Sequence, residues 1–126
     1  RAWMSTQLAD EVRWGVLTEE QLRIILSRPR KWKKEWEALG TSGVRQARLW
    51  HYLADTAAEL AFKTHQRQTM GQEKGVDKTI SRLRARIIQL RLALGDNTVP
   101  QGIVCSRCGR PSAAQDDAAC PYCHPS

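Results

Sequence analysis

The sequence lacks the features of a membrane, secreted or catalytic protein. No apolar run approaches the roughly 18 to 20 residues needed to cross a bilayer, and the N-terminus has no basic start followed by an apolar stretch. We find no serine, histidine and aspartate residues in a pattern typical of a catalytic triad. We also find no pair of carboxylates in an apolar context and no glycine-rich phosphate-binding loop. We therefore expect a soluble, cytoplasmic protein that is not an enzyme and makes no membrane contact.

Basic residues outnumber acidic residues, and this excess of positive charge is unevenly distributed along the chain. The 126 residues are 41% hydrophobic and 26% charged, which is typical of a globular protein, and carry a net charge of +7. Residues 1–95 hold 18 Lys+Arg against 10 Asp+Glu, whereas residues 96–126 hold two against three. The positive field therefore belongs to the first part of the chain, where a polyanionic partner is expected.

Three short helices are predicted before residue 41. Ser5 is the expected N-cap of the first, which runs to about Trp14. Thr18 and Gln21 have the spacing of a capping box, which predicts a second helix. Pro29 has no amide donor and either ends this helix or begins a third.

Residues 41–95 predict an antiparallel helical hairpin. Residues 43–70 contain no proline, and a turn at 71–75 leads to a second helical stretch. Both stretches repeat their packing positions at alternating spacings of three and four. Ile88 and Leu92 lie beside the second set, so we expect them to pack against the N-terminal helices or another subunit. The repeating positions are Trp50, Leu53, Ala57, Leu60 and Thr64, then Val76, Ile80, Leu83, Ile87, Leu90 and Leu94.

All four cysteines lie in two Cys-x-x-Cys pairs. The first pair is Cys105 and Cys108, the second is Cys120 and Cys123, and eleven residues lie between the two pairs. Two such loops supply four thiolates in the tetrahedral arrangement that zinc prefers. Because four cysteines leave no coordination position for water, we expect one structural Zn²⁺ and no catalytic metal.

With Gly109 after the first pair, this region resembles the zinc-ribbon family with its paired rubredoxin-like knuckles. The resemblance rests on the four cysteines and Gly109 and covers about the last 22 residues. It implies a small ribbon with brief strands. The expected fold is an all-α helical bundle with a long antiparallel hairpin, plus a small C-terminal zinc ribbon. The expected units are short helices in 1–40, the hairpin in 41–95, a linker in 96–102 and the ribbon in 103–126.

The same cysteines fit three other chemistries. Cys120-Pro121-Tyr122-Cys123 is the active-site motif of glutaredoxins, but those proteins continue with most of a thioredoxin-like fold, and here three residues follow. With His124 the pair also spells the attachment motif of c-type haem, which would leave the first pair unused. Two disulfides would require an oxidising compartment. We prefer the zinc site, in which His124 could replace a cysteine although four thiols suffice.

Two groups of cations are candidates for phosphate contacts. Residues 28–34 pack five cations around Trp32, either as a phosphate-contacting helix or as a surface helix with solvated lysines. The last helix has no acidic residue from Lys78 to Gly95, whereas a solvated coiled-coil flank normally alternates signs. The candidates are Arg28, Arg30, Lys31, Lys33, Lys34, Arg82, Arg84, Arg86 and Arg91.

These patterns favour a nucleic-acid-binding accessory or regulatory protein with a structural zinc ribbon. The expected partner is DNA or RNA. The alternative is a protein-interaction or assembly subunit, whose hairpin docks on a partner or a second copy through Ile88, Leu92 and the tryptophans.

Overall fold

The computed structural model describes residues 2–27, 38, 41–71, 75–96, 98–99, 105 and 107–111. In this part of the chain it contains four helices, α1 (Ala2–Arg13), α2 (Glu19–Leu26), α4 (Thr41–Met70) and α5 (Val76–Ala93). The described residues are all-α, as predicted. None of the described helices combines the length and apolarity needed to cross a membrane. The expected third helix, the basic segment 28–34 and most of the expected ribbon (103–104, 106 and 112–126) lie outside the described residues.

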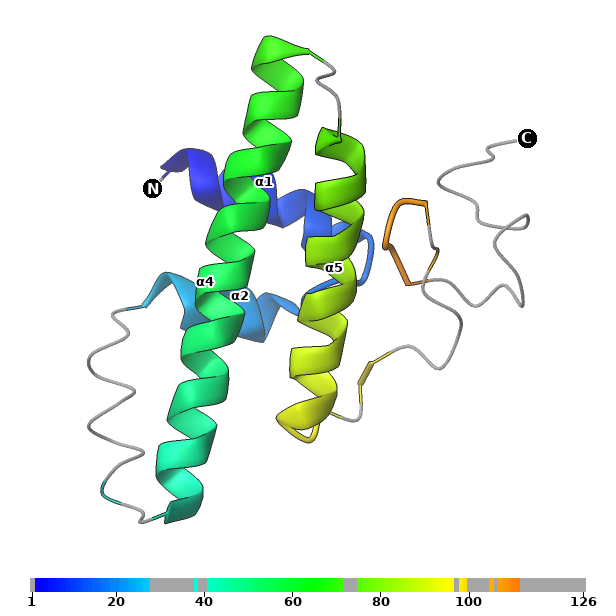
Figure 1. The fold of residues 1–126 in the computed structure, drawn as a ribbon. Helices are drawn as coiled ribbons and strands as arrows, with labels where there is room; N and C mark the ends of the chain where they lie inside the picture. Colours follow the sequence, from blue (N-terminus) through cyan, green and yellow to red (C-terminus); the bar gives the residue numbers. More distant parts are fainter. Residues whose placement is uncertain are drawn as a thin grey trace.

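The two longest helices, α4 and α5, lie side by side and run antiparallel (Figure 1). Apolar side chains at the repeating positions meet between them, where Leu53 and Leu60 of α4 and Ile80 and Ile87 of α5 are buried in one cluster. The spacing of three and four produces this contact because it keeps these residues on one face of each helix.

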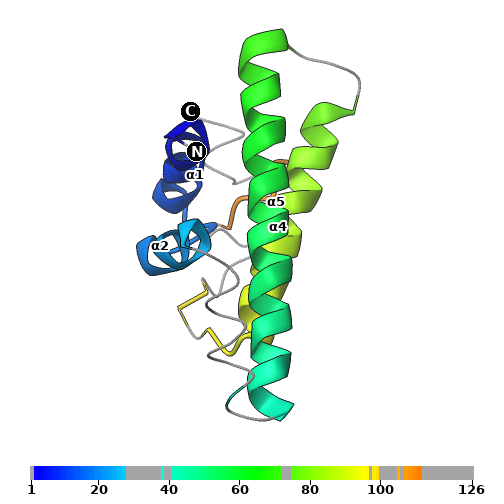
Figure 2. The ribbon, with the colours of Figure 1, turned by 90° about the vertical axis from the view of Figure 1, so that its left-hand side faces the viewer.

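The helices α1 and α2 form a second layer, which lies across one side of the hairpin (Figure 2). Leu8 from α1, Val16 and Leu17 from the turn, and Ile25 from α2 are buried in the same cluster as the hairpin residues. The short helices α1 and α2 are thus held by tertiary packing, since helices of this length are marginal in isolation.

The predicted start of α2 is confirmed and that of α1 is wrong. The Gln21 amide donates to Thr18 Oγ1 and the Thr18 amide donates to Gln21 Oε1, both at 3.0 Å, which completes the capping box. Ser5 does not cap α1, because the helix already begins at Ala2. Packing contacts extend it: Met4 lies against the core cluster, and the Trp3 ring lies 5.5 Å from that of His65 on α4.

Helix α5 is buried over two adjacent stripes. One is the predicted stripe that faces α4. The second is formed by Ser81, Arg84, Ile88 and Arg91, whose exposed fractions are 8%, 5%, 3% and 1%. Leu92, by contrast, is 52% exposed. The expectation that Ile88 is covered is therefore confirmed, whereas Leu92 is not covered by the part of the chain that the structure describes.

Candidate metal centre and nucleic-acid interface

Cys105 and Cys108 lie in a tight backbone turn whose described residues, 105 and 107–110, are here called the first knuckle. The Gly109 amide donates to the Cys105 carbonyl at 2.8 Å, and the Cys105 amide donates to the Arg110 carbonyl at 3.1 Å. Gly109 has a φ of 74°, in the left-handed region that a side chain disfavours. The glycine directly after the first cysteine pair thus occupies a backbone conformation that favours glycine. Cys105 is buried and Cys108 is half-buried.

The other half of the predicted ligand set, Cys120 and Cys123, lies outside the described residues. Among the described residues, no three histidine, cysteine or acidic side chains are grouped to hold a metal ion. The structure therefore describes two of the four expected ligands, and the zinc site stays a prediction.

The first knuckle packs directly on α5 (Figure 1). A Cβ added to Gly109 would lie 2.3 Å from the main-chain oxygen of Ser81 and 2.8 Å from Cβ of Arg84, distances that real Cβ atoms do not adopt. Glycine is therefore required here for two reasons, its positive φ and the close approach of the helix.

Arg84 joins α5 to both α1 and the first knuckle. Its Nε and one terminal nitrogen donate to the two carboxylate oxygens of Glu11, at 2.8 and 3.0 Å, and the other terminal nitrogen donates to the Cys108 carbonyl at 2.8 Å. The two paired side chains are 6% and 1% exposed. This bidentate arrangement satisfies a buried charge with an opposite charge, which is the geometry that burial requires.

The indole ring of Trp14 completes this junction. The guanidinium carbon of Arg110 lies 3.8 Å from the ring centroid, and that of Arg84 lies 5.1 Å from it. Both distances fall within the range of cation–π attraction. The knuckle is thus bound to the helices through its backbone and through one of its own side chains.

Arg91 makes the equivalent connection one heptad further along α5. It donates to the carbonyls of Gly15 and Val16, at 3.1 and 2.9 Å, and to Asp96 at 2.8 Å. Burial on its own raises the pKa of Asp96, but hydrogen bonds from Thr98 and Arg91 outweigh it and lower that pKa to about 2. Arg91 therefore fastens the end of α5 to the turn between α1 and α2.

These contacts correct two of the predicted phosphate ligands. Arg84 and Arg91 are buried, and their guanidinium groups are occupied by protein acceptors, so neither can reach a phosphate. They are seven residues apart and therefore share one face of α5, which is the covered one. Arg82 and Arg86, on another face, are exposed. The five predicted residues of segment 28–34 lie outside the described part of the chain.

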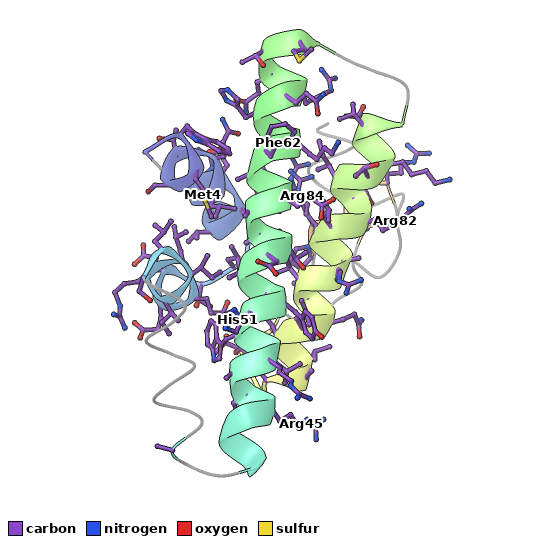
Figure 3. All side chains as sticks on the ribbon, turned by 60° about the vertical axis from the view of Figure 1, so that its left-hand side comes forward. Met4, Arg45, His51, Phe62, Arg82 and Arg84 are labelled. Carbon is purple, nitrogen blue, oxygen red and sulfur yellow. The ribbon has the colours of Figure 1, made fainter. Side chains whose placement is uncertain are left out.

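Arg82 and Arg86 line a groove of about 450 Å³ between α4 and α5. Tyr52, Asp55 and Glu59 of α4 form its other wall. Figure 3 shows Arg45 and Arg82 on the side of the hairpin away from α1 and α2, which we call the outer face.

Two exposed arginines that the sequence analysis did not select, Arg45 and Arg48, extend the outer face. They lie seven and four residues before Tyr52, so they share its face of α4. Residues 41–54 contain no acidic residue, which is the signal that could have drawn attention to them.

A second cleft, of about 490 Å³, lies where α1, α4, α5 and the first knuckle meet. Its lining includes three acidic residues and four arginines. Two of the acids are already paired with cleft arginines: Glu11 with Arg84, and Asp77 with Arg67 at 3.0 Å. The cleft therefore carries nearly balanced charge, unlike the acid-free end of the outer face.

The residues expected to meet a protein partner are dispersed. Ile88 is buried, and both Trp14 and Trp50 pack against the core. Leu92 and Trp3 keep exposed fractions of 52% and 42%. Among the described residues, the predicted apolar docking surface is thus reduced to separate side chains.

Comparison of the chain with protein-family models, with curated proteins and with solved structures gives no significant match. No relative therefore supplies a role for any residue of the knuckle or of the outer face.

Proposed function

We propose that the protein binds nucleic acid through the outer face of the hairpin. The observation that carries the proposal is the placement of exposed cations over helical segments without acids. Residues 41–54 of α4 contain no acidic residue, and neither do residues 78–95, which include most of α5. The next acid, Asp96, accepts from Arg91. The exposed arginines of this face are Arg45, Arg48, Arg82 and Arg86.

The buried ion pairs strengthen this charge argument. In each of the ion pairs Arg84–Glu11 and Arg91–Asp96, one positive and one negative charge neutralise each other inside the protein. The rest of the chain then holds 18 Lys+Arg against 11 Asp+Glu, compared with 20 against 13 overall. The net charge of +7 is unchanged but is carried by fewer charged groups, so the remaining ones are more strongly biased to positive sign.

The same groove also limits where a phosphate can bind. Asp55 and Glu59 lie on its wall and repel phosphate near the middle of α4. A nucleic-acid backbone is therefore expected to run along the end that carries Arg45 and Arg48, toward Arg86. Tyr52 is 53% exposed beside this path and presents a ring on which a base can stack, which favours single strands.

Segment 28–34 is proposed as a second source of phosphate contacts. It contains Arg28, Arg30, Lys31, Lys33 and Lys34, and it lies in the stretch that joins the end of α2 to the start of α4. That start is followed within two turns by Arg45 and Arg48. In the sequence, segment 28–34 therefore precedes the basic end of α4 and is separated from it only by residues 35–40.

The four cysteines are proposed to hold one structural zinc ion. The first knuckle fits this role, because its closed backbone loop and its glycine are those expected of a thiolate turn. Bound zinc would supply the cross-link between the two cysteine pairs that so small a segment needs for folding. The residues that would hold it are Cys105, Cys108, Cys120 and Cys123.

Fluorescence anisotropy with labelled single-stranded and duplex DNA and RNA, over a series of salt concentrations, tests the nucleic-acid proposal. The variants are Arg45→Gln/Arg48→Gln and Arg82→Gln/Arg86→Gln. Each should weaken binding and reduce the slope of log K against log salt by about 1.4 to 1.8, which corresponds to two lost phosphate contacts.

The control variant Arg13→Gln/Arg23→Gln removes the same charge from exposed positions of α1 and α2. It should leave the salt slope nearly unchanged. Absence of wild-type binding near 50 mM salt, or an equal effect of all three variants, would show that the outer face is not a nucleic-acid interface and would favour the assembly role.

A further inference from the structure

The described half of the predicted zinc site is not an isolated tail. The first knuckle rests on the second buried stripe of α5, where Gly109 contacts the backbone of Ser81. Arg84 of the same stripe holds the Cys108 carbonyl, at the residue that supplies one of the predicted thiolates. A metal ligand and a buried arginine of the helical core are therefore linked by one hydrogen bond.

The direction of this hydrogen bond is fixed by Glu11. The carboxylate of Glu11 occupies Nε and one terminal nitrogen of Arg84, which leaves the other terminal nitrogen to donate to Cys108. Because both groups are nearly inaccessible to water, this guanidinium has little freedom to reorient. The knuckle is consequently held at one position on α5.

We propose that Arg84 is a positioning residue for the metal site, and that the helical core preorganises Cys105 and Cys108 for zinc. The inference rests on the zinc site proposed above. In an isolated knuckle, metal binding must order the loop; here the contacts of Arg84 and Gly109 have already ordered it. Groups that orient metal ligands from outside the coordination shell typically contribute 10- to 100-fold to metal affinity.

A reciprocal effect follows from linkage. If docking of the knuckle on α5 raises the affinity for zinc, then zinc must stabilise the docked helical core by the same factor. Zinc would then act on the packing of α1 against α5 as well as on the C-terminal segment. A zinc module joined by a free linker would not have this property.

Arg91 provides a matched control for a purely structural role. It lies on the same stripe of α5, is equally inaccessible, and donates to main-chain carbonyls and an acid, but its acceptors are Gly15, Val16, Asp96 and Thr98 and not the knuckle. Arg91→Met should thus destabilise the helices much as Arg84→Met does, without releasing Cys108.

The experiment measures metal affinity of the full chain. Co²⁺ serves as the probe, because its thiolate charge-transfer absorption reports cysteine ligation, and competition with Zn²⁺ then gives the zinc affinity. We expect Arg84→Met to weaken zinc binding by about 10- to 100-fold and Arg91→Met to change it by less than about threefold.

A second variant, Gly109→Ala, keeps the test valid if Arg84→Met does not fold. It changes a knuckle residue outside every described helix, and its methyl group does not fit against Ser81 and Arg84, so the knuckle must move away from α5. It should weaken zinc binding by a similar factor while far-UV circular dichroism remains that of the wild type.

The outcomes separate this inference from the zinc site itself. Wild-type protein that binds no Co²⁺ or Zn²⁺ through its thiols overturns both. Wild-type protein that binds zinc, together with unchanged affinity in Gly109→Ala, or with equal losses in Arg84→Met and Arg91→Met, overturns the positioning role alone. Loss of affinity in Arg84→Met and Gly109→Ala but not in Arg91→Met supports it.

Discussion

Replacement of Glu11 by leucine is the sharpest test of the helical core. The substitution is close in volume and suits a helix, so its main effect is to leave the Arg84 guanidinium buried without its carboxylate. Removing one partner of a buried ion pair typically costs about 3 to 5 kcal/mol. The upper half of this range is expected, because the side chains are only 6% and 1% exposed and two charge-assisted hydrogen bonds are lost.

The double variant Glu11→Leu/Arg84→Met separates the charge from the packing. It removes both charges and leaves only the Cys108 carbonyl without its donor, which costs about 1 to 3 kcal/mol. The double variant should therefore be more stable than Glu11→Leu alone, although it carries one more substitution. This reversal is the signature of an unpaired buried charge and not of lost contact area.

Urea unfolding followed by far-UV circular dichroism, at a fixed zinc concentration, measures both effects. Domains of this size are stable by only about 5 to 15 kcal/mol, so the loss in Glu11→Leu should move the midpoint far below that of the wild type. The control is Glu20→Leu/Arg23→Met, which removes a solvent-exposed pair on α2 and should leave the midpoint nearly unchanged. A loss below about 1 kcal/mol in Glu11→Leu would refute the assignment of Arg84 as a buried, carboxylate-dependent charge.

Two further predictions concern the ends of helices. Thr18→Ala removes the side-chain acceptor of the capping box and should lower the free energy of unfolding by about 1 kcal/mol, as measured by urea unfolding. Asp96 has a folded-state pKa of about 2, below its usual 3.8, so its ionised form stabilises the fold above pH 4 and this contribution is lost as the pH falls toward 2. The stability difference between wild type and Asp96→Asn should therefore shrink over that interval, and a difference independent of pH would contradict the assignment.

The hairpin and the capping box could be predicted from the sequence because both are local patterns. The spacing of three and four is contained within each helix, and Thr18 recognises a backbone amide only three residues away. Gly109 was likewise marked by its place directly after a Cys-x-x-Cys pair.

The roles of Arg84 and Arg91 could not be predicted in the same way. An arginine is buried only where a distant acceptor meets it, and Glu11 lies 73 residues before Arg84. The sequence did show that the two arginines share a face of α5. That face also carries Ile88, one of the residues that the sequence analysis expected to be covered. The spacing therefore predicted that this stripe of α5 contains a buried residue, but not that its two arginines are buried as well.

The division of α5 into a buried and an exposed face limits the number of phosphate contacts that the outer face can make. With Arg84 and Arg91 committed to the interior, the described outer face offers four arginines, Arg45, Arg48, Arg82 and Arg86. Four phosphate contacts correspond to a salt slope of about −3 to −3.6, whereas addition of the five cations of segment 28–34 would raise its magnitude to about 6 to 8. The measured slope therefore tells whether the outer face acts alone. A steep slope that survives Arg45→Gln/Arg48→Gln would assign the main contacts to segment 28–34.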